Sequence, residues 1–161
     1  MDSTPRIAHV YKDVYPPVQG GVERIISSLA QYTADAYEPI ILVASRSHRG
    51  CQRLLEMGST GNGGPGIQVV EVPSWGRLMS TPLAPGFVSA MKKSRADLFH
   101  FHAPHPTGEL AYLLCGLKTP SVVTYHSDVV RQRAAMLAWN PVYQRFLGRM
   151  RVIMPTSRRV N

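Results

Sequence analysis

The chain has 161 residues, of which 44% are hydrophobic and 17% are charged, and these values suit one soluble globular domain rather than two. No apolar run is long enough to cross a bilayer, and the polar N-terminus lacks the apolar core of a secretion signal, so we expect no secretion. The two cysteines, Cys51 and Cys115, stand far apart, which argues against a disulfide framework or a zinc knuckle and fits thiols in a reducing compartment.

The net charge of +8 is concentrated near the C-terminus. Residues 1–128 hold 11 Lys and Arg against 10 Asp and Glu, whereas residues 129–161 hold seven Arg and no acid. Such a block indicates an anionic partner, such as acidic lipid, a phosphorylated substrate or an acidic patch on a following domain. Nucleic acid is disfavoured, because no aromatic residues interleave with the charge and no reading motif accompanies it.

Apolar runs and helical spacing alternate along the chain. Residues 7–11 predict a short strand, and residues 22–32 predict a helix whose apolar face carries Val22, Ile25, Ile26 and Leu29. The continuous apolar run at 39–45 is typical of a strand buried on both faces of a parallel sheet. The later elements are expected as a helix at 48–57, a strand at 67–73, a helix at 84–95, a strand at 97–102, a helix at 107–117, a strand at 121–125, a helix at 131–149 broken at Asn140-Pro141, and a strand at 152–155.

This alternation predicts an α/β fold, a three-layer Rossmann-like domain with a mostly parallel sheet. Ligands of such sheets bind outside the carboxyl ends of the strands, so the residues that follow each strand are the candidates for a site. The glycine-rich segment 58–66 is expected to be a mobile loop, since it lacks the Gly-Lys-Ser/Thr ending of a phosphate loop. The chain ends just after the last strand, so we expect a domain that is cut near a boundary.

Gly20 and Gly21 stand at the start of the first predicted helix, after a long loop. Adjacent glycines allow unusual backbone angles, and their N–H groups, helped by the helix dipole, can bind an anion such as a diphosphate. An ordinary helix start is the alternative. A nicotinamide site is disfavoured, because the Gly-x-Gly-x-x-Gly fingerprint is absent and Ser45-Arg46 stands where an acidic ribose ligand is expected.

Histidines follow two of the predicted strands. His100, His102 and His105 form His-x-His-x-x-His, and residues two apart on a strand face the same way, so a metal-dependent hydrolase is one alternative. Only Glu109 is near as a carboxylate ligand, which favours histidines that line a cleft. His126 follows the next strand, where it can donate a hydrogen bond to a sugar hydroxyl or stabilise developing charge.

Four segments, YPPVQGGVER, DLFHFHAPHPTGELA, VVTYHSD and a final PTS, together resemble the N-terminal domain of the retaining glycosyltransferases of family four. The resemblance implies the GT-B architecture, in which two Rossmann-like domains face each other across a cleft. It also implies transfer of a sugar from a nucleotide-sugar donor to a glycan or lipid-linked acceptor, with no metal or other cofactor.

The same resemblance assigns roles to particular residues. Gly20 and Gly21 match the paired glycines whose backbone meets the donor diphosphate, and His126 matches the catalytic histidine beside the donor sugar. His102, Asp128 and Arg131 are expected on the acceptor side of the cleft. The C-terminal domain, which supplies the Glu-x7-Glu motif and the nucleoside pocket, lies outside 1–161, so this chain alone is expected to be inactive. A non-catalytic sugar-binding module of the same fold is the alternative.

The arginine-rich region 131–151 combines charge with an apolar stripe made by Met136, Trp139, Tyr143, Phe146, Leu147 and Met150. A basic amphipathic segment of this kind can lie on an anionic membrane. The alternative is a helix that packs on the sheet, with its arginines in solvent or against the C-terminal domain. Because relatives in the family often act on lipid-linked acceptors, we expect a cytoplasmic protein that is peripheral at the inner face of the membrane.

Overall fold

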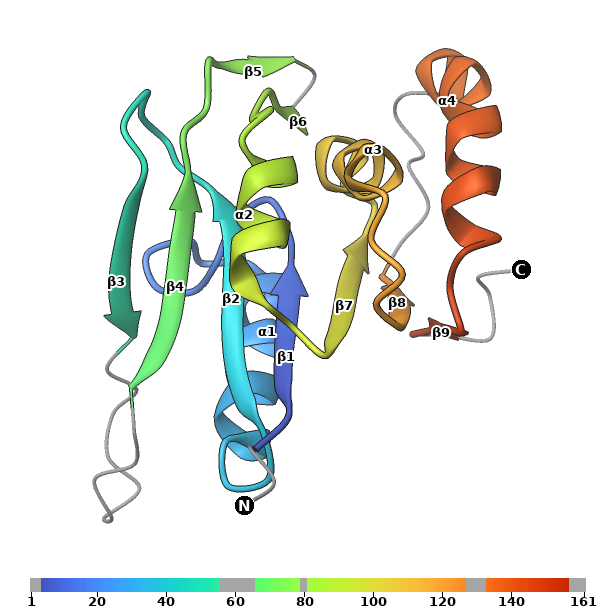
Figure 1. Ribbon diagram of the computed structural model, residues 1–161. Helices are drawn as coiled ribbons and strands as arrows, with labels where there is room; N and C mark the ends of the chain where they lie inside the picture. Colours follow the sequence, from blue (N-terminus) through green and yellow to red (C-terminus); the bar gives the residue numbers. More distant parts are fainter. Residues whose placement is uncertain (1–3, 56–65, 79–80, 127–132, 157–161) are drawn as a thin grey trace.

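A seven-stranded sheet with helices on both faces forms the domain (Figure 1). The computed structural model describes residues 4–55, 66–78, 81–126 and 133–156, without the side chains of 133–138. The strands of the main sheet are β1 (Arg6–Val10), β2 (Glu38–Ala44), β3 (Cys51–Leu55), β4 (Ile67–Val72), β7 (Leu98–Ala103), β8 (Ser121–Tyr125) and β9 (Val152–Pro155). The helices are α1 (Gly21–Thr33), α2 (Phe87–Ser94), α3 (Pro106–Cys115) and α4 (Arg133–Leu147), and β5 (Arg77–Leu78) pairs with β6 (Thr81–Pro82) as a small separate ribbon.

The strand order β3-β4-β2-β1-β7-β8-β9 places a topological switch point in the middle of the sheet. From β1 the chain winds outward through β2 to β4, and then it crosses to the other side of β1 to build β7, β8 and β9. All neighbouring strands are parallel except β3 and β4. The loops that follow β1 and β7 therefore diverge at the carboxyl edge of the sheet, where ligands of doubly wound folds bind.

Two apolar clusters, one on each face of the sheet, hold the layers together and confirm the three-layer prediction. On one face, Ile26 and Ala30 of α1 pack with Ile41 and Val43 of β2. Ile25, which the helical spacing predicted on this face, is instead exposed. On the other face, aromatic rings from α2, α3, α4 and β7 meet, with Phe87, Phe99, Phe101, Tyr112 and Phe146 all buried.

The segment 48–57 is not the predicted helix, because Cys51–Leu55 pairs antiparallel with β4. The free edge of β4 offers a row of backbone donors and acceptors, and pairing with it outweighs the weak local preference for a helix. Within β3, Leu55 is buried while Leu54 is exposed, which is strand alternation rather than a helical face. Nearly all of the glycine-rich segment 58–66 lies outside the described residues.

Helix α4 runs through Pro141 without ending there, so the predicted break at Asn140-Pro141 is wrong. Packing of Tyr143 and Phe146 into the core compensates for the backbone hydrogen bond that a proline removes. In the described part of the apolar stripe, Tyr143 and Phe146 are buried and Trp139, Leu147 and Met150 are partly buried against the core, while Arg145 and Arg149 remain exposed. Met136 lies outside the described side chains. None of the described helices has the length and hydropathy that a membrane-spanning segment requires.

A buried carboxylate joins α3 to α4. Glu109 is 1% exposed; it accepts a hydrogen bond from the His105 backbone N–H at 2.7 Å and another from Trp139 Nε1 at 3.0 Å. Burial raises the pKa of the Glu109 carboxyl, although the two donors act in the opposite direction. Both oxygens of the side chain are thus used to fix the start of α3 and the position of α4.

We expect Glu109→Ala to lower the free energy of unfolding by about 2–4 kcal/mol, because two buried donors lose their acceptor and a cavity opens. Urea denaturation measures this loss. The matched control is Glu38→Ala, which removes an exposed ion pair with Arg6 and should cost less than about 1 kcal/mol. Equal losses of unfolding free energy in the two variants would show that the hydrogen bonds of Glu109 contribute no more to stability than an exposed ion pair.

Candidate functional site

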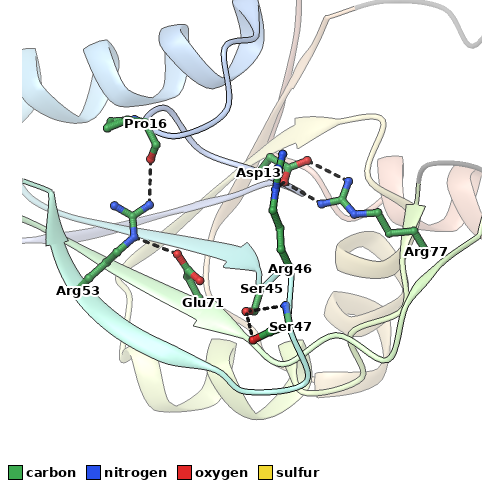
Figure 2. A network of polar contacts seen from close by, with 8 residues as sticks. All are labelled: Asp13, Pro16, Ser45, Arg46, Ser47, Arg53, Glu71 and Arg77. Atoms are coloured by element: carbon green, nitrogen blue, oxygen red, sulfur yellow. Dashed lines mark hydrogen bonds and ion pairs between the residues drawn. The ribbon is translucent and has the colours of Figure 1, made fainter.

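The loop between β1 and α1 is held in place by side chains from β3 and β5 (Figure 2). Asp13 is buried and accepts two hydrogen bonds from the Arg77 guanidinium, at 2.8 and 3.2 Å. Arg53 of β3 donates to the Pro16 carbonyl at 3.0 Å and pairs with Glu71 of β4. The loop that leads to the glycine turn is therefore anchored to the sheet edge and to the β5 strand.

The glycine turn itself has ordinary backbone angles. Gly20 caps α1 in an extended conformation, with φ of −112° and ψ of 157°, and Gly21 is the first helical residue. The turn therefore does not use the unusual backbone angles that glycine allows, and what matters at the two positions is the missing side chain. A Cβ at Gly21 would meet no atom within 4 Å, whereas a Cβ at Gly20 would lie 1.8 Å from an oxygen of Glu23.

Glu23 fills the space beside Gly20. This residue is the third of the helix, and its side chain is buried. A carboxylate there interacts favourably with the positive end of the helix dipole. Of the two predicted phosphate contacts, Gly21 thus borders open space at the helix N-terminus, while Gly20 is covered by an acidic side chain.

Four histidines gather on the face of the sheet that also carries Tyr11, across β1, β7 and the end of β8. His102 Nδ1 lies 3.0 Å from His126 Nε2, and His102 Nε2 lies 3.3 Å from His9 Nδ1. His100 stacks on His102 with ring centroids 4.3 Å apart and bonds Thr124 through Nε2 at 2.7 Å. His126 is half-buried, whereas His102 is only 1% exposed. His102, which was predicted to line the cleft, is therefore buried and contacts the more exposed His126.

These histidines are uncharged at neutral pH. Burial, together with repulsion from His100, lowers the pKa of His9 to about 3, and burial and His126 lower that of His100 to about 4. Burial and the neighbouring rings also lower the pKa of His102 well below its usual value, and burial lowers that of His126. The cluster therefore acts as a set of neutral donors and acceptors rather than as a positive charge.

The structure does not bring together His100, His102 and His105, the trio of the alternative metal-dependent hydrolase. His105 packs edge-on against Phe87, with ring centroids 5.1 Å apart, and both its ring nitrogens are buried without a partner in the described parts of the chain. His9 takes its place, since ligand nitrogens of His9, His100 and His102 all lie within 4.8 Å of one another. No carboxylate belongs to this group in the part of the chain that the structure describes.

His9 is the member of the cluster that the sequence analysis missed. The available signal was a polar residue in the middle of the apolar run 7–11, where a strand buried on both faces has no room for an unpaired side chain. The predicted cleft residues Asp128 and Arg131 lie outside the described residues.

A polar pocket of about 410 Å³ lies where β2 and β4 end, among the residues directly after strands that the sequence analysis named as candidates for a site. Of the arginines that line the pocket, Arg46 is the more exposed. Its side chain is 65% exposed and its Nε lies 3.8 Å from Asp13, whose oxygens already accept hydrogen bonds from Arg77. Trp75 stands 72% exposed at the rim. The pocket is lined by Ser45, Arg46, Ser47, His48, Ser74, Trp75, Gly76 and Arg77.

Trp75 also borders a second, apolar pocket of about 600 Å³ between the β5–β6 ribbon and helices α2, α3 and α4. Leu78, Leu83, Leu110 and Leu114 are exposed there, and the Trp139 ring adds to the wall while its N–H is bound to Glu109. A concave apolar surface of this size is in the range of pockets that take small ligands. The two pockets meet at one tryptophan.

Comparison with known proteins identifies the family of the chain. A profile of the family described as Glycosyltransferase Family 4 matches residues 19–161. O-antigen chain mannosyltransferase C of Escherichia coli is 27% identical over 94% of this chain and 39% of its own length, and D-rhamnosyltransferase WbpZ of Pseudomonas aeruginosa is 26% identical over 94% and 38%. The chain spans about two fifths of the length of these relatives. The glycine turn and three of the four clustered histidines fall within the matched region, and the chain belongs to Glycosyltransferase Family 4.

Proposed function

We propose that this chain is the N-terminal, acceptor-side domain of a retaining GT-B glycosyltransferase, which moves a sugar from a nucleotide-sugar donor to a glycan or lipid-linked acceptor. The observation that carries the proposal is the open helix N-terminus at Gly21, set at the switch point of a parallel sheet. There, backbone N–H groups and the helix dipole favour an anion of diphosphate type.

His126 is the proposed catalytic contact. It follows β8 at the same carboxyl edge as the glycine turn, and its backbone N–H is fixed to the Ala103 carbonyl at 3.1 Å. In the proposed reaction the acceptor oxygen bonds to the anomeric carbon, the bond from that carbon to the diphosphate breaks, and the acceptor proton passes to the departing diphosphate. A hydrogen bond from His126 to a sugar oxygen would orient the donor for this step.

The donor sugar and base would be chosen by a second domain. Names of the two relatives indicate mannosyl and rhamnosyl transfer, so a hexose or deoxyhexose is the proposed class of donor. The nucleoside pocket is proposed to belong to that second domain, so the domain formed by this chain is proposed to be inactive alone. No metal or other cofactor is part of the proposal.

The acceptor is proposed to bind where the polar and apolar pockets meet. Arg46 and the serine-rich wall suit hydroxyl or phosphate oxygens, and the exposed Trp75 ring offers a face on which a sugar can stack. The apolar pocket favours the lipid-linked form of acceptor over a free glycan. Exposed arginines of α4 and the segment after it would then face anionic headgroups, as expected of a cytoplasmic enzyme at the inner face of a membrane.

We expect Gly21→Trp in the full-length enzyme to reduce kcat/KM by at least about 100-fold, because an indole in the open space at the helix N-terminus displaces the diphosphate. Steady-state transfer from the nucleotide sugar measures this loss. Tyr32→Trp is the control, since Tyr32 is 81% exposed on the same helix. Unimpaired transfer by a folded Gly21→Trp enzyme would refute the phosphate assignment.

We expect Trp75→Ala to raise the KM for the acceptor about tenfold and to leave the KM for the donor unchanged. Loss of a stacking face and of apolar contact removes about 1.4 kcal/mol of binding free energy. Varying each substrate in turn separates the two constants, and Tyr32→Ala is the matched loss of an exposed ring. An unchanged acceptor KM would place the acceptor elsewhere.

A further inference from the structure

The His126 ring is hydrogen-bonded to the interior of the domain. Its Nε2 meets His102 Nδ1 at 3.0 Å, and the other nitrogen of His102 meets His9 Nδ1 at 3.3 Å. The three residues stand on β1, on β7 and directly after β8, which are neighbours in the sheet. One row of imidazoles therefore crosses three strands, from the half-buried His126 to the fully buried His9.

Neutral imidazoles restrict how this row can be protonated. Each neutral ring carries one N–H donor and one bare nitrogen that accepts. Burial lowers the pKa of all three rings, so none carries a second proton at neutral pH. Only two arrangements keep both hydrogen bonds: all three rings protonated on Nδ1, or all three on Nε2.

The buried end distinguishes the two arrangements. His9 Nε2 is inaccessible to solvent and has no hydrogen-bond partner among the residues that the structure describes. If the rings carry their protons on Nε2, a buried N–H at His9 is left without an acceptor, a situation that folded proteins avoid most strictly. If the rings carry their protons on Nδ1, only a lone pair of His9 Nε2 is left without a partner. The N–H groups of His9 and His102 then both point along the row toward His126.

We propose that His9 and His102 are positioning residues that hold His126 in the Nδ1–H tautomer, so that the nitrogen of His126 outside the row is a hydrogen-bond donor. His126 Nε2 is then occupied as the acceptor from His102. In the glycosyltransferase proposed above, on which this consequence rests, His126 donates to a sugar oxygen and does not take a proton from the acceptor hydroxyl.

His100 is a natural comparison for the row. It stacks on His102 as closely as any ring in the cluster, but its Nε2 bonds Thr124 and no bond joins it to the row. Replacing His100 therefore disturbs the packing around His102 without removing a hydrogen bond of the row. Replacing His102 removes the donor to His126 directly.

The test is a long-range proton–nitrogen NMR spectrum of the full-length protein labelled with ¹⁵N-histidine, recorded at neutral pH. We expect a protonated Nδ1 and an unprotonated Nε2 at His126, His102 and His9. In His102→Phe we expect both tautomers of His126, whereas His100→Phe keeps the single one. A protonated Nε2 at His126 in the native protein overturns the proposal, and so does an unchanged tautomer in His102→Phe.

The native spectrum alone decides the direction of the row if the variant fails to fold. Zinc titration of the same sample adds an independent check, because His9, His100 and His102 also have metal-ligand spacing. Stoichiometric perturbation of the His9 and His102 nitrogens by zinc would overturn the proposal, since the metal would take the nitrogens that form the row. These spectra need no sugar transfer, so an inactive protein with the expected tautomers would refute the proposed function alone.

Discussion

The buried carboxylate of Asp13 is the contact on which the arrangement of the site depends. Its two hydrogen bonds with Arg77 join the loop after β1 to the β5 strand, and Arg46 Nε lies 3.8 Å from the same carboxylate. A buried ion pair of this kind adds little net stability, because desolvation offsets the attraction, but losing one partner is costly. Its effect is geometric: one carboxylate sets both the path of the chain into the glycine turn and one wall of the polar pocket.

The histidine row obeys a related constraint. Burying a charged imidazole inside the sheet is unfavourable, so the rings stay neutral and each buried N–H needs an acceptor. Such a row is rigid because a change at one ring requires a change at the next. Together the two features set the carboxyl edge of the sheet, where the open helix N-terminus at Gly21, the half-buried His126 and the polar and apolar pockets lie.

Hydrophobic periodicity predicted the architecture, because the pattern of buried side chains determines which segments form strands and which form helices. The run 39–45 could only be a central strand, and the alternation of strands and helices leads to a parallel sheet with its ligand edge at the strand ends. Long-range partners decided what periodicity could not. Segment 48–57 became a strand because β4 has a free edge, and α4 continues through Pro141 because its aromatic face packs into the core. Gly20, Gly21 and His126 were predicted as site residues from their positions after strands. Asp13, Arg77 and His9 could not be predicted, because their contacts join residues distant in sequence.

The most direct test of the central claim is a crystal structure of the full-length protein with its nucleotide-sugar donor bound. The account predicts diphosphate oxygens within hydrogen-bond distance of the Gly21 backbone N–H, with the Glu23 carboxylate beside them rather than between them and the helix. It also predicts that the donor sugar contacts the His126 ring nitrogen that His102 leaves free. A diphosphate held at the Arg46 pocket, with the glycine turn empty, would contradict it.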